Sequence, residues 1–261
     1  MRIATWNVNS VRQRIDHLTS WLAEAMPDVC CLQELKCQDD AFPRLEIEAL
    51  GYTVETHGQK TFNGVAILSR HRLEDVTRGL PDQPGEPQSR YIEALVTPVN
   101  GKPVRVASLY APNGNPLGTE KFPYKLAFLE ALIKRARSLL TSEERFVIAG
   151  DYNIIPAARD AEHPDLWVKD ALYQPESRAK WQELLNLGLT DALRATSDAG
   201  KSYTFWDYQA GAWQKNNGIR IDHLVISPQL ADHLTSTAID SHVRGWEKPS
   251  DHVPIRIDLD I

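Results

Sequence analysis

The chain has 261 residues, of which 42% are hydrophobic and 25% charged, as is ordinary for a globular protein. It contains no run of about 18 apolar residues, and its first residues, MRIATWNVNS, lack the pattern of a signal peptide, so the sequence predicts no membrane partner. The formal net charge of −6 excludes a surface covered in basic patches, but it leaves room for a nucleic acid bound on one face.

Strand and helix patterns alternate from the N-terminus onward. Residues 2–8 predict a strand, and apolar residues then recur at helical spacing from Val11 to Leu22, with Ser10 as the expected helix cap. Cys30 and Cys31 lie in the next apolar run. Together with Cys37 they make a poor disulfide framework, which indicates a reducing compartment, and we expect a cytoplasmic protein.

Further apolar runs predict strands at 28–34, 64–70, 91–96, 103–113, 145–153 and 220–227. The longest helical pattern covers about 120–140, and residues 253–261 alternate apolar and polar as a half-buried final strand does. No Gly/Ser linker or repeat divides the chain. We therefore expect one domain over residues 1–261, of the α/β class with sheets packed against helices, although the pattern does not give the strand order.

Several of these strand patterns end in a carboxylate or an amide. The residues are Asn7, Asn9, Glu34, Asp151, Asn153 and Asp222, and Asp251 stands just before the final strand. Each one taken alone is most simply a turn or cap residue. Together they predict that the strand ends converge on one polar site, whose oxygen ligands would suit Mg²⁺ or Mn²⁺ and phosphate-ester chemistry.

Eight motifs occur in a fixed order: WNVNS (6–10), LQELK (32–36), NGVAILSR (63–70), LYAPNG (109–114), GDYNI (150–154), YTFWDY (203–208), RIDHLVIS (220–227) and SDHVPI (250–255). With them the chain resembles, along its whole length, the exonuclease III family of AP endonucleases. That family lies within the endonuclease/exonuclease/phosphatase superfamily. The resemblance implies a four-layer α/β sandwich, in which two facing mixed β-sheets are flanked by helices.

The same resemblance implies an activity. It indicates a Mg²⁺- or Mn²⁺-dependent enzyme that cleaves duplex DNA on the 5′ side of abasic sites in base excision repair. It also implies 3′–5′ exonuclease activity and removal of 3′ phosphates or sugar fragments. The expected partner is therefore double-stranded DNA with abasic sites or damaged 3′ ends, and the family's usual state is a monomer.

Roles follow from the resemblance at matching positions. Glu34 matches the main metal ligand, and the other residues expected at the ion are Asn7, Asp151, Asn153, Asp251 and His252. The expected catalytic residues are Tyr110, Asp151, Asn153, Asp222 and His252. Asp222 would hold His252, and either Asp151 or His252 would activate the attacking water. The number of ions, one or two, stays open.

The resemblance also indicates residues that touch DNA. Those expected along the backbone are Asn9, Lys36, Arg90, Asn113 and Lys121, and those expected around a flipped-out abasic sugar are Phe205, Trp206 and Ile219. Relatives often carry Trp or Leu where Ile219 stands, and a residue smaller than Trp is expected to loosen selectivity. Residues 157–180 match the family only loosely, so the role of this loop, with His163 and Trp167, stays open.

Ser250, Asp251 and His252 are the three residue types of a hydrolase triad, but their adjacency argues against one. Neighbours in an extended segment point to opposite faces, and a triad combines residues that are distant in sequence. We therefore interpret Ser250 as a turn residue, Asp251 as a metal-side carboxylate and His252 as the partner of Asp222.

Two alternative functions remain. One is another phosphodiesterase of the same superfamily, such as a nonspecific DNase, an inositol phosphatase or a sphingomyelinase. The secreted relatives among these usually carry signal peptides and disulfides, which the sequence does not predict here. The other is a non-catalytic DNA-binding module, which the full set of site residues disfavours.

Overall fold

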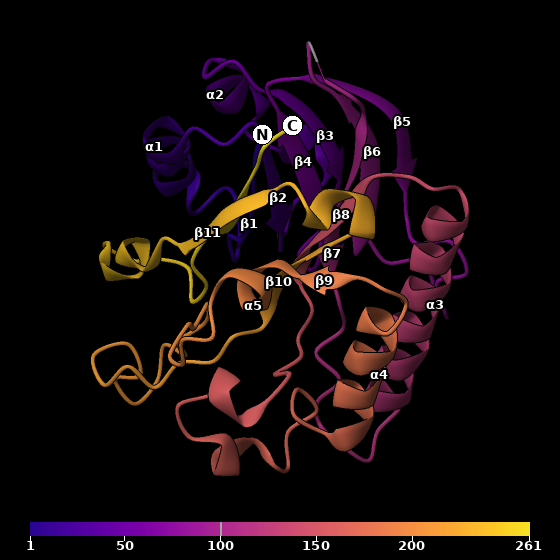
Figure 1. Ribbon diagram of the computed structural model, residues 1–261. Coiled ribbons are helices and arrows are strands. Elements are labelled where there is room, and N and C mark those ends of the chain that lie inside the picture. Colours follow the sequence, from indigo (N-terminus) through magenta and orange to yellow (C-terminus); the bar gives the residue numbers. More distant parts are fainter. Residues whose placement is uncertain (100) are drawn as a thin grey trace.

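The computed structural model describes residues 1–99 and 101–261, and this part of the chain forms two six-stranded sheets (Figure 1). The first sheet has the order β11 (Leu234–Ile239), β12 (Ile255–Leu259), β1 (Arg2–Asn7), β2 (Val29–Gln33), β4 (Val65–Ser69), β3 (Thr53–His57). The second has the order β5 (Arg72–Arg78), β6 (Tyr91–Thr97), β7 (Val104–Tyr110), β8 (Phe146–Asp151), β10 (Asp222–Ile226), β9 (Thr190–Asp191). Both sheets are mixed, because β1 and β2 pair in parallel, as do β7 and β8, while the other neighbours are antiparallel.

The two sheets face each other across an apolar layer made by alternate residues of their strands. Ile3 and Cys31 enter it from the first sheet, and Val106 and Val147 enter it from the second, all without solvent exposure. Burying alternate apolar side chains between two sheets is the main hydrophobic stabilisation that this strand pattern allows.

Helices cover the outer face of each sheet, as Figure 1 shows for α1 on one flank and for α3 and α4 on the other. Helix α1 (Ile15–Ala25) packs through Leu18 and Leu22 on the first sheet. Helices α3 (Lys121–Thr141) and α4 (Pro175–Leu185) pack on the second sheet. The predicted four-layer α/β sandwich is therefore confirmed.

Shorter helices lie in the connections. They are α2 (Arg44–Glu48), α5 (Ala192–Thr196) and α6 (Pro228–Ala231), with 3₁₀ turns at Asp39–Ala41, Ala158–Asp160, Pro164–Trp167 and Ser241–Gly245. Among the described residues, no helix combines the length and the apolar character needed to cross a bilayer.

The segment after β1 differs from its predicted form. Helix α1 begins at Ile15 and Ser10 does not cap it; Ser10 has a φ of 87°. The amides of Val8 and Ser10 instead donate to the carbonyls of Gln33 and Glu34, at 3.1 and 2.8 Å. Backbone pairing with the segment after β2 thus replaces the first helical turn and fixes these two loops side by side.

Candidate active site

The strands that carry the candidate residues meet at one edge of the sandwich. Strands β1, β7 and β8 end at Asn7, Tyr110 and Asp151, and the antiparallel strand β10 begins at Asp222. Tyr110 and Asp222 are the register partners of Asp151 on its two sides. Glu34 directly follows β2. Strand direction and register therefore bring these side chains from both sheets to one place.

A cavity of about 330 Å³ opens at this edge. The expected site residues that line it are Glu34, Tyr110, Asn113, Asp151, Asn153, Phe205, Asp251 and His252. Asn7 is fully buried, and its Nδ2 donates to Glu34 Oε1 at 2.9 Å and to Asp151 Oδ2 at 3.0 Å. One amide thus holds two carboxylates, one from each sheet, at a fixed separation.

Three of these residues form a candidate metal site. Glu34, Asp151 and His252 each offer a ligand atom, and these atoms lie within 4.8 Å of one another. The other oxygen of Glu34, Oε2, pairs with Lys36 Nζ at 2.9 Å. The half-buried Glu34 and the buried Asp151, held beside each other, fit a divalent cation, because such an ion neutralises their mutual repulsion.

The other residues expected at the ion are engaged elsewhere in the structure. Asp251 lines the cavity, but its Oδ1 accepts from Asn9 Nδ2 at 3.0 Å. Asn153 has a φ of 50°, donates from its amide to Asp151 Oδ1 at 2.9 Å, and donates from Nδ2 to the carbonyl of Ala111 at 2.9 Å. Asn153 therefore orients Asp151 through its backbone.

His252 is paired with Asp222. Its Nδ1 lies 2.8 Å from Asp222 Oδ2, and its Nε2 lies 3.8 Å from Asp151 Oδ2. Burial alone would lower the pKa of His252, but the charge of Asp222, the hydrogen bond to it and the charge of Asp151 together raise this pKa to about 10. The imidazole is therefore held as a cation that faces the cavity, and in this form it has no lone pair for a metal ion, which leaves Glu34 and Asp151 as the metal-binding pair of the cluster.

The carboxyl groups of the site differ in their electrostatics. Burial raises the pKa of Asp151 to about 7, with His252 opposing the shift and Asp222 adding to it. Burial would also raise the pKa of Glu34, but the charge of Lys36 and the hydrogen bond from Asn7 hold it below its usual value. Glu34 is thus anionic, while Asp151 is poised to accept a proton near neutral pH.

Tyr110 keeps its proton. Burial raises its pKa well above the usual value, and the charges of Glu34 and Asp151 raise it further. The guanidinium of Arg90 lies over the Tyr110 ring, 4.9 Å from the centroid. The hydroxyl is therefore a hydrogen-bond donor at neutral pH.

The expected sugar pocket is only partly formed by the residues assigned to it. Phe205 lines the cavity, with its ring centroid 5.0 Å from that of His252. Trp206 does not line it: the ring packs into the core against Trp213, and its Nε1 donates to Asn216 Oδ1 at 3.1 Å. This placement corrects the assignment of Trp206, because adjacent residues of an extended segment point to opposite faces.

Ile219 is also displaced from its expected role. It is 2% exposed and pairs through its backbone with Phe205, so it supports the cavity from below and does not line it. The apolar wall is made by Ile221 and Leu172, which the sequence reading missed. The sequence could have indicated Ile221 as a cavity residue, because it is two residues from Ile219, on the same face of an extended segment, and directly precedes Asp222.

The expected DNA-contacting cations have different surroundings. Lys36 holds Glu34, as described, and its Nζ also donates to Asn9 Oδ1. Arg90 Nε donates to Gln88 Oε1 at 2.6 Å. Lys121, the first residue of α3, is exposed and does not line the cavity.

Lys125 of α3 is a further residue that the sequence reading missed. It has no solvent exposure, and its Nζ donates to the carbonyls of Asn113, Asn153 and Ala171, three segments around the site. Burial lowers the pKa of Lys125 to about 7, against the charges of Asp151 and Asp170. The sequence could have indicated this residue, because Lys125 lies three and four residues before Phe128 and Leu129 and so on the buried face of α3.

Comparisons with known proteins agree with this geometry. Residues 4–252 match the model of the endonuclease/exonuclease/phosphatase family. The chain is 34% identical to the exodeoxyribonuclease III of Haemophilus influenzae, with 98% of each chain covered. A 3′ phosphatase from Neisseria called NExo, bound to a product DNA hairpin, superposes with a TM-score of 0.95 at 40% identity and full coverage of both chains. An AP endonuclease from Archaeoglobus fulgidus superposes with a TM-score of 0.94 at 34% identity, again with full coverage.

Proposed function

Because the chain belongs to the endonuclease/exonuclease/phosphatase family, as a nuclease of the exonuclease III type, we propose that it repairs DNA at abasic sites and damaged 3′ ends. The proposed reaction is hydrolysis of the phosphodiester on the 5′ side of an abasic site, with 3′–5′ exonuclease and 3′-phosphatase activity. The observation that carries the proposal is the cluster of Glu34, Asp151 and His252, with Asp222 behind the histidine.

Each residue of the cluster has a chemical task. Glu34 and Asp151, held by Asn7, would bind the divalent cation on which this family depends, which we propose to be Mg²⁺. When bound, the ion supplies positive charge that neutralises the phosphate in the transition state. His252, a cation through Asp222, would donate to a phosphate oxygen, and Asp151 would accept a proton from the attacking water.

Product analysis on three duplexes tests this function. The duplexes carry one abasic site, a nick with a 3′ phosphate, or an undamaged recessed 3′ end, and each is incubated with Mg²⁺, Mn²⁺ or EDTA. The proposal predicts metal-dependent incision of the abasic duplex that is lost in EDTA and in Asp151→Asn. Turnover of the undamaged or phosphate-bearing ends without abasic incision would overturn the AP-endonuclease assignment.

One observation favours a narrower activity. The relative at 40% identity is described as a 3′ phosphatase and a 3′–5′ exonuclease, without mention of abasic sites. In this chain Ile221, Leu172 and Trp167 form apolar parts of the cavity wall. Under this second candidate, the 3′-phosphate duplex is the preferred substrate in the same assay.

We further propose that the protein works as a monomer in the cytoplasm. Its three cysteines are buried and unpaired, which fits a reducing compartment. Sedimentation with and without DNA tests the oligomeric state. A protein that dimerises and cleaves DNA only in the dimeric form would contradict the proposed monomer.

A further inference from the structure

A second cavity of about 270 Å³ adjoins the catalytic cavity. Trp167, Asp170 and Asp207 line both of them, so one ligand with two parts can contact both cavities at once. We call this second cavity the Trp167 subsite; its further lining includes Leu166, Ala210 and Asn217. It belongs to the loops 162–170 and 207–218, which the proposed chemistry does not use.

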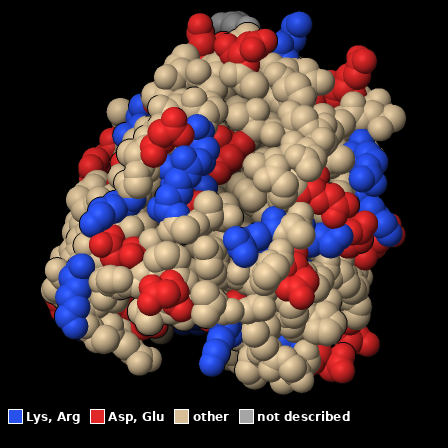
Figure 2. All heavy atoms as spheres, turned by 60° about the horizontal axis from the view of Figure 1, so that its bottom comes forward, with Lys and Arg blue, Asp and Glu red and all other residues tan. Residues whose placement is uncertain are grey.

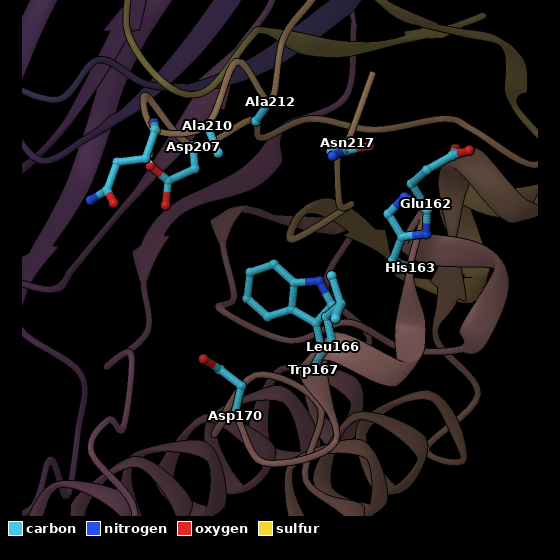
Figure 3. A pocket seen from close by; sticks show the side chains of 11 residues that line it. Glu162, His163, Leu166, Trp167, Asp170, Asp207, Ala210, Ala212 and Asn217 are labelled. Atoms are coloured by element: carbon cyan, nitrogen blue, oxygen red, sulfur yellow. Dashed lines mark hydrogen bonds between the residues drawn. The ribbon is translucent and has the colours of Figure 1, made fainter. Parts of the chain in front are cut away.

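The Trp167 side chain lies among the residues that line the subsite. Figure 3 shows the Trp167 ring between the loop that carries Asp207, Ala210 and Ala212 and the segment that carries Asp170. Two side chains of the facing loop, Ala210 and Ala212, are small, and the Trp167 ring borders the cavity. A flat apolar group suits a cavity lined by an indole, because aromatic faces bind planar rings by stacking.

The Trp167 ring is held in place before any ligand arrives. It packs on the small apolar cluster that includes Leu172, Ile219 and Ile221, and this cluster also forms the wall of the catalytic cavity. Val168, which directly follows the 3₁₀ turn, and Leu166, which precedes Trp167 in it, are 56% and 72% exposed. The chain therefore buries its tryptophan partly while leaving two smaller apolar neighbours in solvent.

The charge of the subsite disfavours a phosphate. Its carboxylates are Glu162, Asp170 and Asp207, its one imidazole is that of His163, and no lysine or arginine is among its lining residues. One oxygen of each aspartate is occupied, because Asp170 Oδ1 accepts from Asn115 Nδ2 at 2.9 Å and Asp207 Oδ1 accepts from the Gln209 amide at 2.8 Å. Their second oxygens make no hydrogen bond to the described residues, so they are free to accept from amino groups.

We propose that the Trp167 subsite binds the base of an unpaired nucleotide whose phosphate lies in the catalytic cavity. This rests on the proposed nuclease function. The base stacks on the indole, its N–H donors (the exocyclic amino group of A, C or G, or the ring N–H of G or T) meet the free carboxylate oxygens of Asp170 and Asp207, and its phosphate stays beside His252. The subsite would thus select frayed or mismatched 3′ ends over paired ones, since only an unpaired base can leave the stack.

Kinetics on two matched duplexes test the proposal. One ends in a mismatched 3′ nucleotide, and the other carries a 3′ phosphate at the same position and so presents no extra base. Trp167→Ala is expected to raise KM for the mismatched end by roughly ten-fold more than for the phosphate end, as loss of one base–aromatic stack does. Trp167→Phe should keep most of the difference between the two substrates, and Val168→Ala, directly after the same turn, should resemble the wild type.

A binding measurement separates this proposal from the proposed function. A duplex with an unpaired 3′-terminal 2-aminopurine is titrated into Asp151→Asn, where stacking on the indole should quench its fluorescence. The quenching should disappear in Asp151→Asn combined with Trp167→Ala. Equal KM changes for both duplexes, or quenching that survives loss of Trp167, would overturn the subsite. A wild-type protein that cleaves neither duplex would overturn the nuclease function, and the fluorescence result would still decide the subsite.

Discussion

At the scale of single residues, the site concentrates negative charge at a cost to stability. Asp151 is buried with its pKa raised, which means that its ionised form is less favourable in the folded protein than in the unfolded chain. Asn7 and the cation on His252 offset only part of this cost. A divalent ion bound here would supply the remaining compensation, which would link stability and metal binding at this residue.

Asp151→Asn is expected to stabilise the metal-free protein while it abolishes turnover. Because the folded pKa of Asp151 is raised, ionisation of this carboxyl lowers the free energy of unfolding. This loss is absent below the unfolded pKa, grows as the pH rises from there to the folded value of about 7, and is complete at pH 8. At pH 8 in EDTA we expect a gain of about 1–3 kcal/mol by urea unfolding, and near pH 4 no gain. A variant that is less stable than the wild type at pH 8 would contradict this assignment.

Ser250 and His252 should respond differently to truncation. Ser250 Oγ donates to the carbonyl of Asn7 at 2.7 Å and accepts from the amide of His252 at 3.2 Å, which is the bonding of a turn residue. Ser250→Ala is expected to cost about 1–2 kcal/mol of stability and to change kcat by less than ten-fold. His252→Ala should lower kcat by roughly 10²-fold to 10⁴-fold. Equal inactivation of both in single-turnover assays would restore the triad interpretation.

At the scale of elements, periodicity predicted most of the strands and the convergence of their polar ends, while the two facing sheets were implied by the family resemblance. What it could not predict were features decided by contacts between distant segments. Ser10 became a pairing residue because the segment after β2 offered carbonyls to its amide. Trp206 carries the motif of a pocket residue, yet its neighbour Phe205 takes the cavity face. The subsite of Trp167 arises where two irregular loops meet, which no periodicity describes.

Helix α3 connects to the site through one side chain. Lys125 Nζ donates hydrogen bonds to the carbonyls of Asn113 and Asn153. Gly114, at a φ of 92°, packs closely against the same lysine, since an added Cβ would lie 2.8 Å from Lys125 Cδ. The ammonium form has three N–H donors for its three carbonyl acceptors. Lys125 therefore joins the loops that carry Asn113 and Asn153.

Lys125→Met tests this positioning role. The change leaves buried carbonyls without a donor, so we expect a loss of about 2–4 kcal/mol in unfolding free energy and at least a ten-fold fall in kcat/KM. Combined with Asn113→Ala, the fall in kcat/KM should be much smaller than the product of the two single effects. Fully multiplicative effects, in variants that are folded at the assay temperature, would show that Lys125 acts only on stability.

At the scale of the whole molecule, the proposed function requires a protein of negative net charge to bind DNA, which is also negatively charged. Figure 2 shows the molecule turned so that the bottom of Figure 1 faces the viewer. On this face, lysine and arginine side chains are interspersed with carboxylates. The net charge of −6 opposes long-range attraction, and two of the expected DNA-contacting cations, Lys36 and Arg90, are bonded within the protein. Affinity must then depend on few phosphate contacts and on the site itself.

This predicts an unusually weak salt dependence of DNA affinity. Each phosphate contact contributes a slope of roughly −0.9 to a plot of log affinity against log salt, so three contacts give a slope of about −3, well below that of strongly basic DNA-binding proteins. Fluorescence anisotropy with Asp151→Asn and an abasic duplex, between about 50 and 200 mM KCl, measures the slope.

Lys121→Gln should reduce the magnitude of this slope by about one unit, because Lys121 is exposed and free of ion pairs to the described residues. Lys36→Gln should instead lower turnover, since Lys36 holds Glu34 and makes no net contribution to counterion release. An unchanged slope in Lys121→Gln would place the DNA backbone away from the start of α3.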